Sequence, residues 1–162
     1  MLGIALKNIS EGLFEPEKLQ LGNDYYISSD AFSMLMIANE THPATLIEGQ
    51  ILAWNFDSTF IIVKQKPHRE IIDSIYNIKP NANYNELVKL YNENKTYYYW
   101  IIDKREELDS YYDYNEKIRK YTKGLYGPYT QEEYLEKRKE LNVSDTLKLK
   151  EIEKSFFGTP FR

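Results

Sequence analysis

The chain has 162 residues, of which 42% are apolar and 28% charged, and such a length and composition are typical of a single folded domain. It contains no cysteine and no stretch of 18 apolar residues, which excludes disulfides, cysteine-bound zinc and a membrane-spanning helix. Its formal net charge of −4 at pH 7 argues against nucleic acid as a partner, because such binding depends on neutralising phosphates.

The first half of the chain is expected to contain strands. Residues 1–23 are interpreted as an N-terminal segment. Apolar and aromatic runs then predict strands over residues 25–28 and 31–38, although the second run could also form a helical turn. Residues 39–44 include Thr-His-Pro and are expected to form a loop.

The clearest pattern is a β-hairpin. Residues 46–56 and 59–65 are rich in β-branched and aromatic side chains and flank the polar pair Asp57-Ser58, which predicts two antiparallel strands joined by a tight turn. Residues 96–103, Thr-Tyr-Tyr-Tyr-Trp-Ile-Ile-Asp, have the highest β-propensity in the chain and are expected to form a central strand.

Two helices are expected between these strands. Apolar residues recur at helical spacing over residues 67–77, with Pro67 in the first turn. A second helix over residues 84–91 should begin at Asn83, with Glu86 as the reciprocal partner of a capping box.

The last third mixes a charged excursion with helical patterns. Residues 104–126 are rich in charge and tyrosine and predict an edge strand near their end, followed by a turn at Gly127-Pro128. Thr130 and Glu133 predict a capped helix over residues 131–141. Ser144 is expected to begin a further helix that ends at Gly158.

These elements predict an α+β fold in one domain, residues 1–162. We expect an antiparallel β-meander of about five strands, with inserted helices, over residues 24–126. Helices should pack on one face of the sheet, and residues 127–158 should form C-terminal helices.

Three runs resemble a family of small uncharacterised bacterial proteins, a domain-of-unknown-function group with some lipoprotein members. They are WNFDSTFIIVKQ over residues 54–65, YYWIID over residues 98–103 and GPYTQEEY over residues 127–134. The resemblance spans about residues 50–141 and implies no catalytic residues. The chain lacks the lipid-accepting cysteine and the leader of the lipoprotein members, so a cytoplasmic location is expected, with the envelope as an alternative if a leader has been removed.

Aromatic residues are the main candidates for binding, since the chain has 15 tyrosines, 7 phenylalanines and 2 tryptophans. Tyrosine combines apolar area with a polar tip, which suits recognition surfaces as well as half-exposed sheet faces. Strand alternation should place Tyr97 and Tyr99 on one face of their strand, and Tyr98 and Trp100 on the other. The candidate binding residues are Trp54, Tyr97, Tyr99, Tyr111, Tyr112 and Tyr114.

Candidates for catalysis and metal binding are few. Asp57 and Asp103 each follow an apolar strand, so they could pair for acid–base or cation chemistry, or could simply stabilise turns. His42 precedes Pro43 in a loop and His68 falls on an apolar helix face, positions that favour structural roles. No glycine-rich phosphate loop is present, and no cofactor is expected.

These observations favour a non-enzymatic protein-interaction module, for example a toxin-immunity protein or an inhibitor encoded by a phage or mobile element. Residues 1–63 carry two lysines against eight acids, so the partner could be basic. One alternative is a small-molecule or carbohydrate-binding domain that uses aromatics on a sheet face. A second alternative is a hydrolase that uses Asp57 and Asp103.

Overall fold

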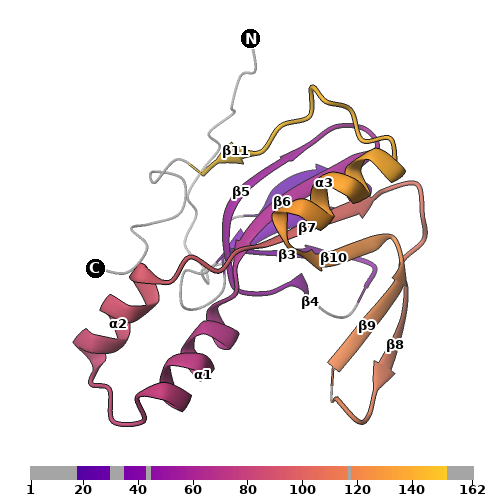
Figure 1. Cartoon of the computed structure of the whole chain (residues 1–162). Coiled ribbons are helices and arrows are strands. Elements are labelled where there is room, and N and C mark those ends of the chain that lie inside the picture. Colours follow the sequence, from indigo (N-terminus) through magenta and orange to yellow (C-terminus); the bar gives the residue numbers. More distant parts are fainter. Residues whose placement is uncertain (1–17, 30–34, 43–44, 117, 153–162) are drawn as a thin grey trace, which may run out of the picture.

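We describe the protein from a computed structural model, which defines residues 18–29, 35–42, 45–116 and 118–152 (Figure 1). Within these residues the chain forms eleven strands in three antiparallel sheets, together with three helices. This confirms the predicted α+β class and its antiparallel strands. The strands number more than the five expected, because β1, β4, β8, β9 and β11, whose bounds are given below, were not predicted as separate strands.

The first sheet contains β1 (Leu19–Gly22), β2 (Tyr25–Ser29), β3 (Leu35–Asn39) and β4 (Thr45–Ile47), in that order. The second sheet has the order β10 (Leu125–Tyr129), β7 (Tyr98–Asp103), β6 (Phe60–Lys66), β5 (Gln50–Phe56) and β11 (Lys150–Glu151). The third sheet is a hairpin of β8 (Asp109–Asp113) and β9 (Ile118–Lys123).

The predicted hairpin is confirmed as β5 and β6, which pair antiparallel. Its turn is stabilised by Asp57, whose Oδ1 accepts hydrogen bonds of 2.7 Å from the backbone amides of both Thr59 and Phe60. The first arm starts later than predicted. Residues 45–47 belong to β4 in the first sheet, and Gly49, with a φ of 90°, lies between the two strands. The predicted strand over residues 96–103 is confirmed as β7, which has neighbours on both sides.

The main core lies between the first and second sheets. Its members are fully or almost fully buried and come from both sheets: Leu21, Tyr25, Ile27, Leu35, Ile37, Leu46, Ile47, Ile51, Ile61, Val63, Ile102 and Leu125. The first sheet therefore covers one face of the second sheet as a β-sandwich, an arrangement that was not predicted.

Lys104 joins the two sheets at their edge. Its side chain is only 8% exposed, and its Nζ donates hydrogen bonds to the backbone carbonyls of Leu21 in the first sheet and Asp57 in the second. Burial of the ammonium group lowers the pKa of Lys104.

The opposite face of the second sheet packs against α3 (Gln131–Glu140) and the segment that follows it. This smaller core contains Phe60, Ile62, Tyr99, Ile101, Tyr134, Val143 and Leu147. The other two helices, α1 (His68–Ile78) and α2 (Tyr84–Glu93), pack on each other around Ile71, Ile75 and Tyr91. They project from the body as a helical hairpin (Figure 1). Of the three helices in the described residues, α3 alone thus covers the sheet, whereas several helices were predicted to pack on one face.

The predicted helix caps are confirmed. The Asn83 side chain accepts a hydrogen bond from the Glu86 amide, and the Glu86 carboxylate accepts one from the Asn83 amide. Thr130 and Glu133 form the same reciprocal pair at the start of α3. Both helices therefore begin at the residues that the sequence indicates.

The helix predicted from Ser144 is wrong for the part that the structure defines. Residues 144–149 are turn and irregular structure, and Lys150 and Glu151 form the edge strand β11 against β5. Arg138 explains the difference, because its Nη2 donates to the carbonyls of Ser144 and Leu147 at 2.7 and 2.8 Å. Residues 153–158 of the predicted helix lie outside the described residues.

The charged excursion over residues 104–126 contains the β8–β9 hairpin. The predicted edge strand near its end is confirmed as β10. Gly127 and Pro128 lie within β10 and do not form the separate turn that was predicted.

Candidate ligand-binding cleft

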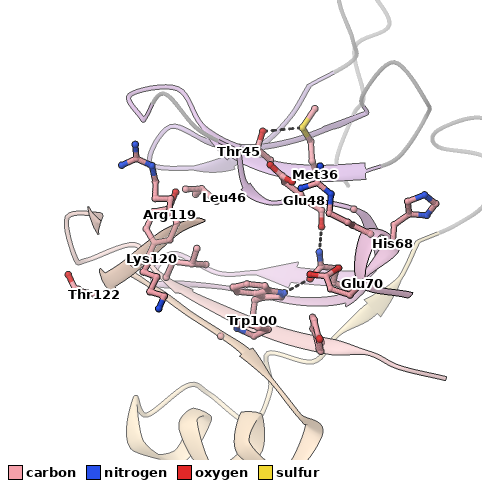
Figure 2. Close-up of a pocket in the computed structure, with 18 of the residues that line it drawn as sticks. Met36, Thr45, Leu46, Glu48, His68, Glu70, Trp100, Arg119, Lys120 and Thr122 are labelled. Atoms are coloured by element: carbon pink, nitrogen blue, oxygen red, sulfur yellow. Dashed lines mark hydrogen bonds between the residues drawn. The ribbon is translucent and has the colours of Figure 1, made fainter. Parts of the chain in front are cut away.

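A cleft of about 1200 Å³ opens where the sandwich meets the β8–β9 hairpin (Figure 2). Its walls come from β3 and β4 of the first sheet, from β6, β7 and β10 of the second, from the first turn of α1 and from the hairpin. Segments that lie far apart in the sequence therefore build this one site.

The floor of the cleft continues the inner face of the second sheet. Gln65 pairs with Tyr98, and Val63 pairs with Trp100, so these four side chains lie on the same face. Val63 belongs to the sandwich core, whereas Gln65, Tyr98 and Trp100 line the cleft. The cleft thus begins where the first sheet no longer covers this face.

Trp100 is fixed in orientation. Its indole Nε1 donates a hydrogen bond of 2.7 Å to Oε1 of Gln65, and Gln65 Nε2 in turn donates to the backbone carbonyl of Glu48 (Figure 2). Gly127 packs against the ring so closely that a Cβ there would lie 2.8 Å from Cε3 of Trp100. The indole is therefore held before any ligand arrives.

The opposite wall is formed by the first sheet. Met36 on β3 and Thr45 and Leu46 on β4 face the floor across the gap (Figure 2). The Thr45 hydroxyl donates a 3.5 Å hydrogen bond to the sulfur of Met36. Met36 and Leu46 make this wall mainly apolar, and the Thr45 hydroxyl is already engaged in a hydrogen bond.

The β8–β9 hairpin bounds one end of the cleft. Tyr111, Lys120 and Thr122 line it from one face of the hairpin, and Arg119 and Tyr121 from the other. The hairpin also contacts His42, which lies in the segment that follows β3 of the first sheet. There His42 Nε2 lies 3.5 Å from Ser110 Oγ, and its ring centroid lies 5.6 Å from that of Tyr121.

The charges around the cleft nearly balance. Glu48 and Glu70 are acidic, and Arg69, Arg119 and Lys120 are basic. Lys120 is neutralised by ion pairs of 2.9 Å to Asp113 and 2.8 Å to Glu116, which raise its pKa. Burial raises the pKa of the Tyr121 phenol, which keeps this ring neutral.

The structure does not bring Trp54 together with Tyr97 and Tyr99. Trp54 pairs with Val63 and packs on the sandwich core, whereas Tyr97 and Tyr99 contribute to the core under α3. The three rings therefore lie on opposite faces of the second sheet. Tyr99 is buried and stacks on Tyr134 with centroids 5.1 Å apart, so it is a packing residue.

The three tyrosines predicted on the charged excursion all lie on or next to β8. Tyr111 lines the cleft. Tyr112 and Tyr114 are exposed and contact each other with ring centroids 5.1 Å apart, and they do not line the cleft.

The two aspartates lie at the same end of the second sheet, because Asp103 pairs with Phe60, next to the Asp57 turn. Both carboxylates make turn contacts. Asp57 accepts from backbone amides, and Asp103 forms a salt bridge of 2.6 Å with Arg105, whose hydrogen bonds lower the pKa of Asp103. This geometry matches the interpretation of both as turn residues.

His68 lines the cleft and contacts the ring of Tyr91 edge-on, with centroids 5.1 Å apart. No group of three or more potential metal ligands occurs among the residues that the structure defines. In the same part of the chain, no helix is long and apolar enough to cross a membrane.

Sequence reasoning did not identify Trp100, Tyr98 and Tyr121 as cleft residues. Alternation did place Tyr98 and Trp100 together on one face, which the structure confirms. Which of the two faces stays open depends on where the first sheet ends, and no local pattern carries that information.

A family model described as protein of unknown function, DUF3997, matches residues 22–153. No curated protein and no solved structure matches the chain.

Proposed function

The chain belongs to this family of proteins of unknown function, DUF3997, and within it we propose that this protein is a ligand-binding module whose cleft takes a small molecule or a carbohydrate, with no chemical step. The single observation behind this proposal is the immobilised Trp100 on the floor of the cleft. A ring that is already fixed loses little conformational freedom on binding, which favours affinity.

The rest of the cleft fits this role. Binding sites for small ligands are concave, mostly apolar and lined by aromatic side chains, with a few polar groups that orient the ligand. Here Tyr98, Tyr111 and Tyr121 add aromatic surface, and Arg69 and Glu70 supply polar groups at the start of α1.

The two tryptophans allow a direct test. In Trp54→Phe, Trp100 becomes the only tryptophan and reports on the cleft, whereas in Trp100→Phe the remaining Trp54 reports on the same sheet face outside the cleft lining. Fluorescence of both variants is titrated with monosaccharides, oligosaccharides, nucleosides and aromatic acids at millimolar concentrations. We expect at least one class to change the Trp100 signal and to leave the Trp54 signal unchanged. If Trp100 responds to none of them, the cleft is not a binding site for these ligands.

A protein partner is the second candidate, because the tip of the α1–α2 hairpin exposes apolar side chains. Ile78 is 83% exposed and Tyr84 is 63% exposed, and both lie next to the turn between the helices. Exposed apolar side chains that form a contiguous patch are typical of docking surfaces. Affinity capture from a host lysate should recover a protein with the wild-type chain, and should not recover it with Ile78→Lys/Tyr84→Lys. Equal recovery by both would exclude this surface.

A further inference from the structure

We infer that the ligand of the cleft is an uncharged oligosaccharide of more than one ring, an inference that rests on the proposed binding function. Three properties of the cleft support it: its charge balance, its size and the distribution of its aromatic rings.

The charge balance favours an uncharged ligand. Glu48 and Glu70 offset Arg69 and Arg119, and the charge of Lys120 is neutralised within the hairpin. A site with no net charge gains nothing from long-range attraction to an anionic or cationic ligand. Carboxylate and guanidinium groups of both signs nevertheless accept and donate hydrogen bonds, which suits the hydroxyl groups of a sugar.

The size favours a ligand longer than one ring. At about 1200 Å³ the cleft exceeds the roughly 300–1,000 Å³ that is typical of sites for drug-sized molecules. A monosaccharide would leave most of this space filled with water. A chain of several sugar units could extend from α1 to the hairpin.

The aromatic rings are distributed along this path. Tyr98 and Trp100 lie on the floor, and Tyr111 and Tyr121 lie on the hairpin at one end. The apolar C–H faces of sugar rings pack on aromatic rings, while their hydroxyl edges remain free to bond polar side chains. A row of separate rings therefore fits successive sugar units.

An extended peptide fits the cleft less well. Peptides commonly bind by adding a strand to a free sheet edge. The edge strands that the two larger sheets present to the cleft are poor templates, since β4 has only three residues and β10 contains Pro128, which has no backbone N–H to donate.

The test uses Trp54→Phe, with Trp100 as the sole reporter, and hexasaccharides matched in length. The neutral sugars are maltohexaose, cellohexaose and N-acetylchitohexaose. They are compared with anionic hexagalacturonate, with cationic chitohexaose and with an uncharged Gly/Ser hexapeptide. Chitohexaose has the same rings as N-acetylchitohexaose but carries free amines. We expect at least one neutral sugar to bind at least tenfold more tightly than either charged sugar and to keep its affinity in 0.5 M NaCl. The dissociation constant should also be at least tenfold lower than for the corresponding monosaccharide.

Further variants locate the binding. Against the same neutral sugar, measured by calorimetry, we expect Trp100→Ala to weaken binding at least tenfold and Trp54→Ala to leave it unchanged. Preferential binding of a charged sugar or of the peptide would overturn this inference but keep the proposed binding function. A Trp100 signal that responds to none of the hexamers, while responding to nucleosides or aromatic acids, would also overturn only the inference. A signal that responds to nothing would overturn both.

Discussion

The orientation of the Trp100 ring depends on Gly127, a neighbour that has no side chain. Gly127 has a φ of 130°, and an added Cβ would lie 2.8 Å both from Trp100 Cε3 and from the carbonyl oxygen of Tyr99. A backbone conformation that side chains rarely adopt coincides here with a close approach to the indole. The position of the indole in the cleft is therefore fixed partly by this glycine.

We expect Gly127→Ala to lower the free energy of unfolding by about 1–3 kcal/mol and to shift the Trp100 emission, because both backbone strain and a steric clash are introduced. Urea unfolding and fluorescence of the Trp54→Phe background measure the two effects. Gly22→Ala is the matched control. Its φ of 86° is also positive, but its Cβ would meet only the end of the Lys104 side chain at 3.2 Å, so the Trp100 emission should not change. An unaltered emission in Gly127→Ala would contradict this account.

Tyr91 links stability to pH. Its ring packs between α1 and α2, its hydroxyl donates a hydrogen bond of 3.2 Å to Gln50 Oε1, and burial raises its pKa to about 12. The unfolded chain loses this proton near the ordinary tyrosine pKa of about 10, whereas the folded chain keeps it until about pH 12. The contribution of Tyr91 is thus complete below pH 10 and is lost as the pH rises through 12.

We expect Tyr91→Phe to reduce the loss of stability between pH 10 and pH 12, because the variant has no phenol to ionise in this position. Chemical unfolding at a series of pH values measures the slope. Tyr114→Phe is the control, since Tyr114 is 84% exposed and should not change the slope. Equal slopes in wild type and Tyr91→Phe would show that another group controls the alkaline transition.

At the scale of elements, the capping boxes of α2 and α3 can be predicted directly from the sequence. A capping box needs only two side chains three residues apart and the intervening backbone. The starts of α2 and α3 were therefore predictable from Asn83, Glu86, Thr130 and Glu133, without any knowledge of the rest of the fold.

We expect Thr130→Ala to lower the free energy of unfolding by about 1 kcal/mol, because the Glu133 amide at the start of α3 loses its acceptor. Thr130→Ser should restore most of the loss, since serine keeps the hydroxyl. Thermal and urea unfolding measure both variants. A serine variant as unstable as the alanine variant would mean that the methyl group, and not the cap, provides the stability.

Segments without a local cap were harder to predict. Leu147 is buried in the core under α3, and Leu149 packs against that core from a partly buried position. Their apolar character could equally indicate one face of a helix. The segment is not helical because Arg138 binds two of its carbonyls and because β11 pairs with the free edge of β5.

At the scale of the whole molecule, the β8–β9 hairpin is an appendage to the sandwich. Among the described strands it shares no ladder with the other two sheets. Its base is closed by the Glu106 carboxylate, which accepts hydrogen bonds from the Gly124 amide and the Tyr126 hydroxyl. Its two ends meet, because a Cβ on Gly124 would lie 3.5 Å from Cα of Leu108.

We expect the chain to tolerate replacement of residues 109–123 by Asn-Gly. The midpoint of thermal unfolding should fall by no more than about 10 °C, mainly because the packing of Tyr121 on the core is lost. Ligand binding by the cleft should weaken strongly in the same variant, because five of the lining residues are removed. Calorimetry and the Trp100 titration measure the two effects. Loss of cooperative unfolding would mean that the hairpin is part of the folding core.

The sequence by itself determined the elements whose signals are local: the β5–β6 hairpin with its Asp57 turn, strand β7, the three helices and two of their caps. These depend on side-chain alternation, helical spacing and hydrogen bonds within a few residues. Only the tertiary structure decided which face of β7 stays open. The side chains of Tyr98 and Trp100 are as large and apolar as those of the buried Tyr99 and Ile101, so residue type does not distinguish the two faces. The difference between the faces arises from the position of the first sheet and of α3. Burial is a property of what packs against a strand, and those partners come from segments far away in the chain.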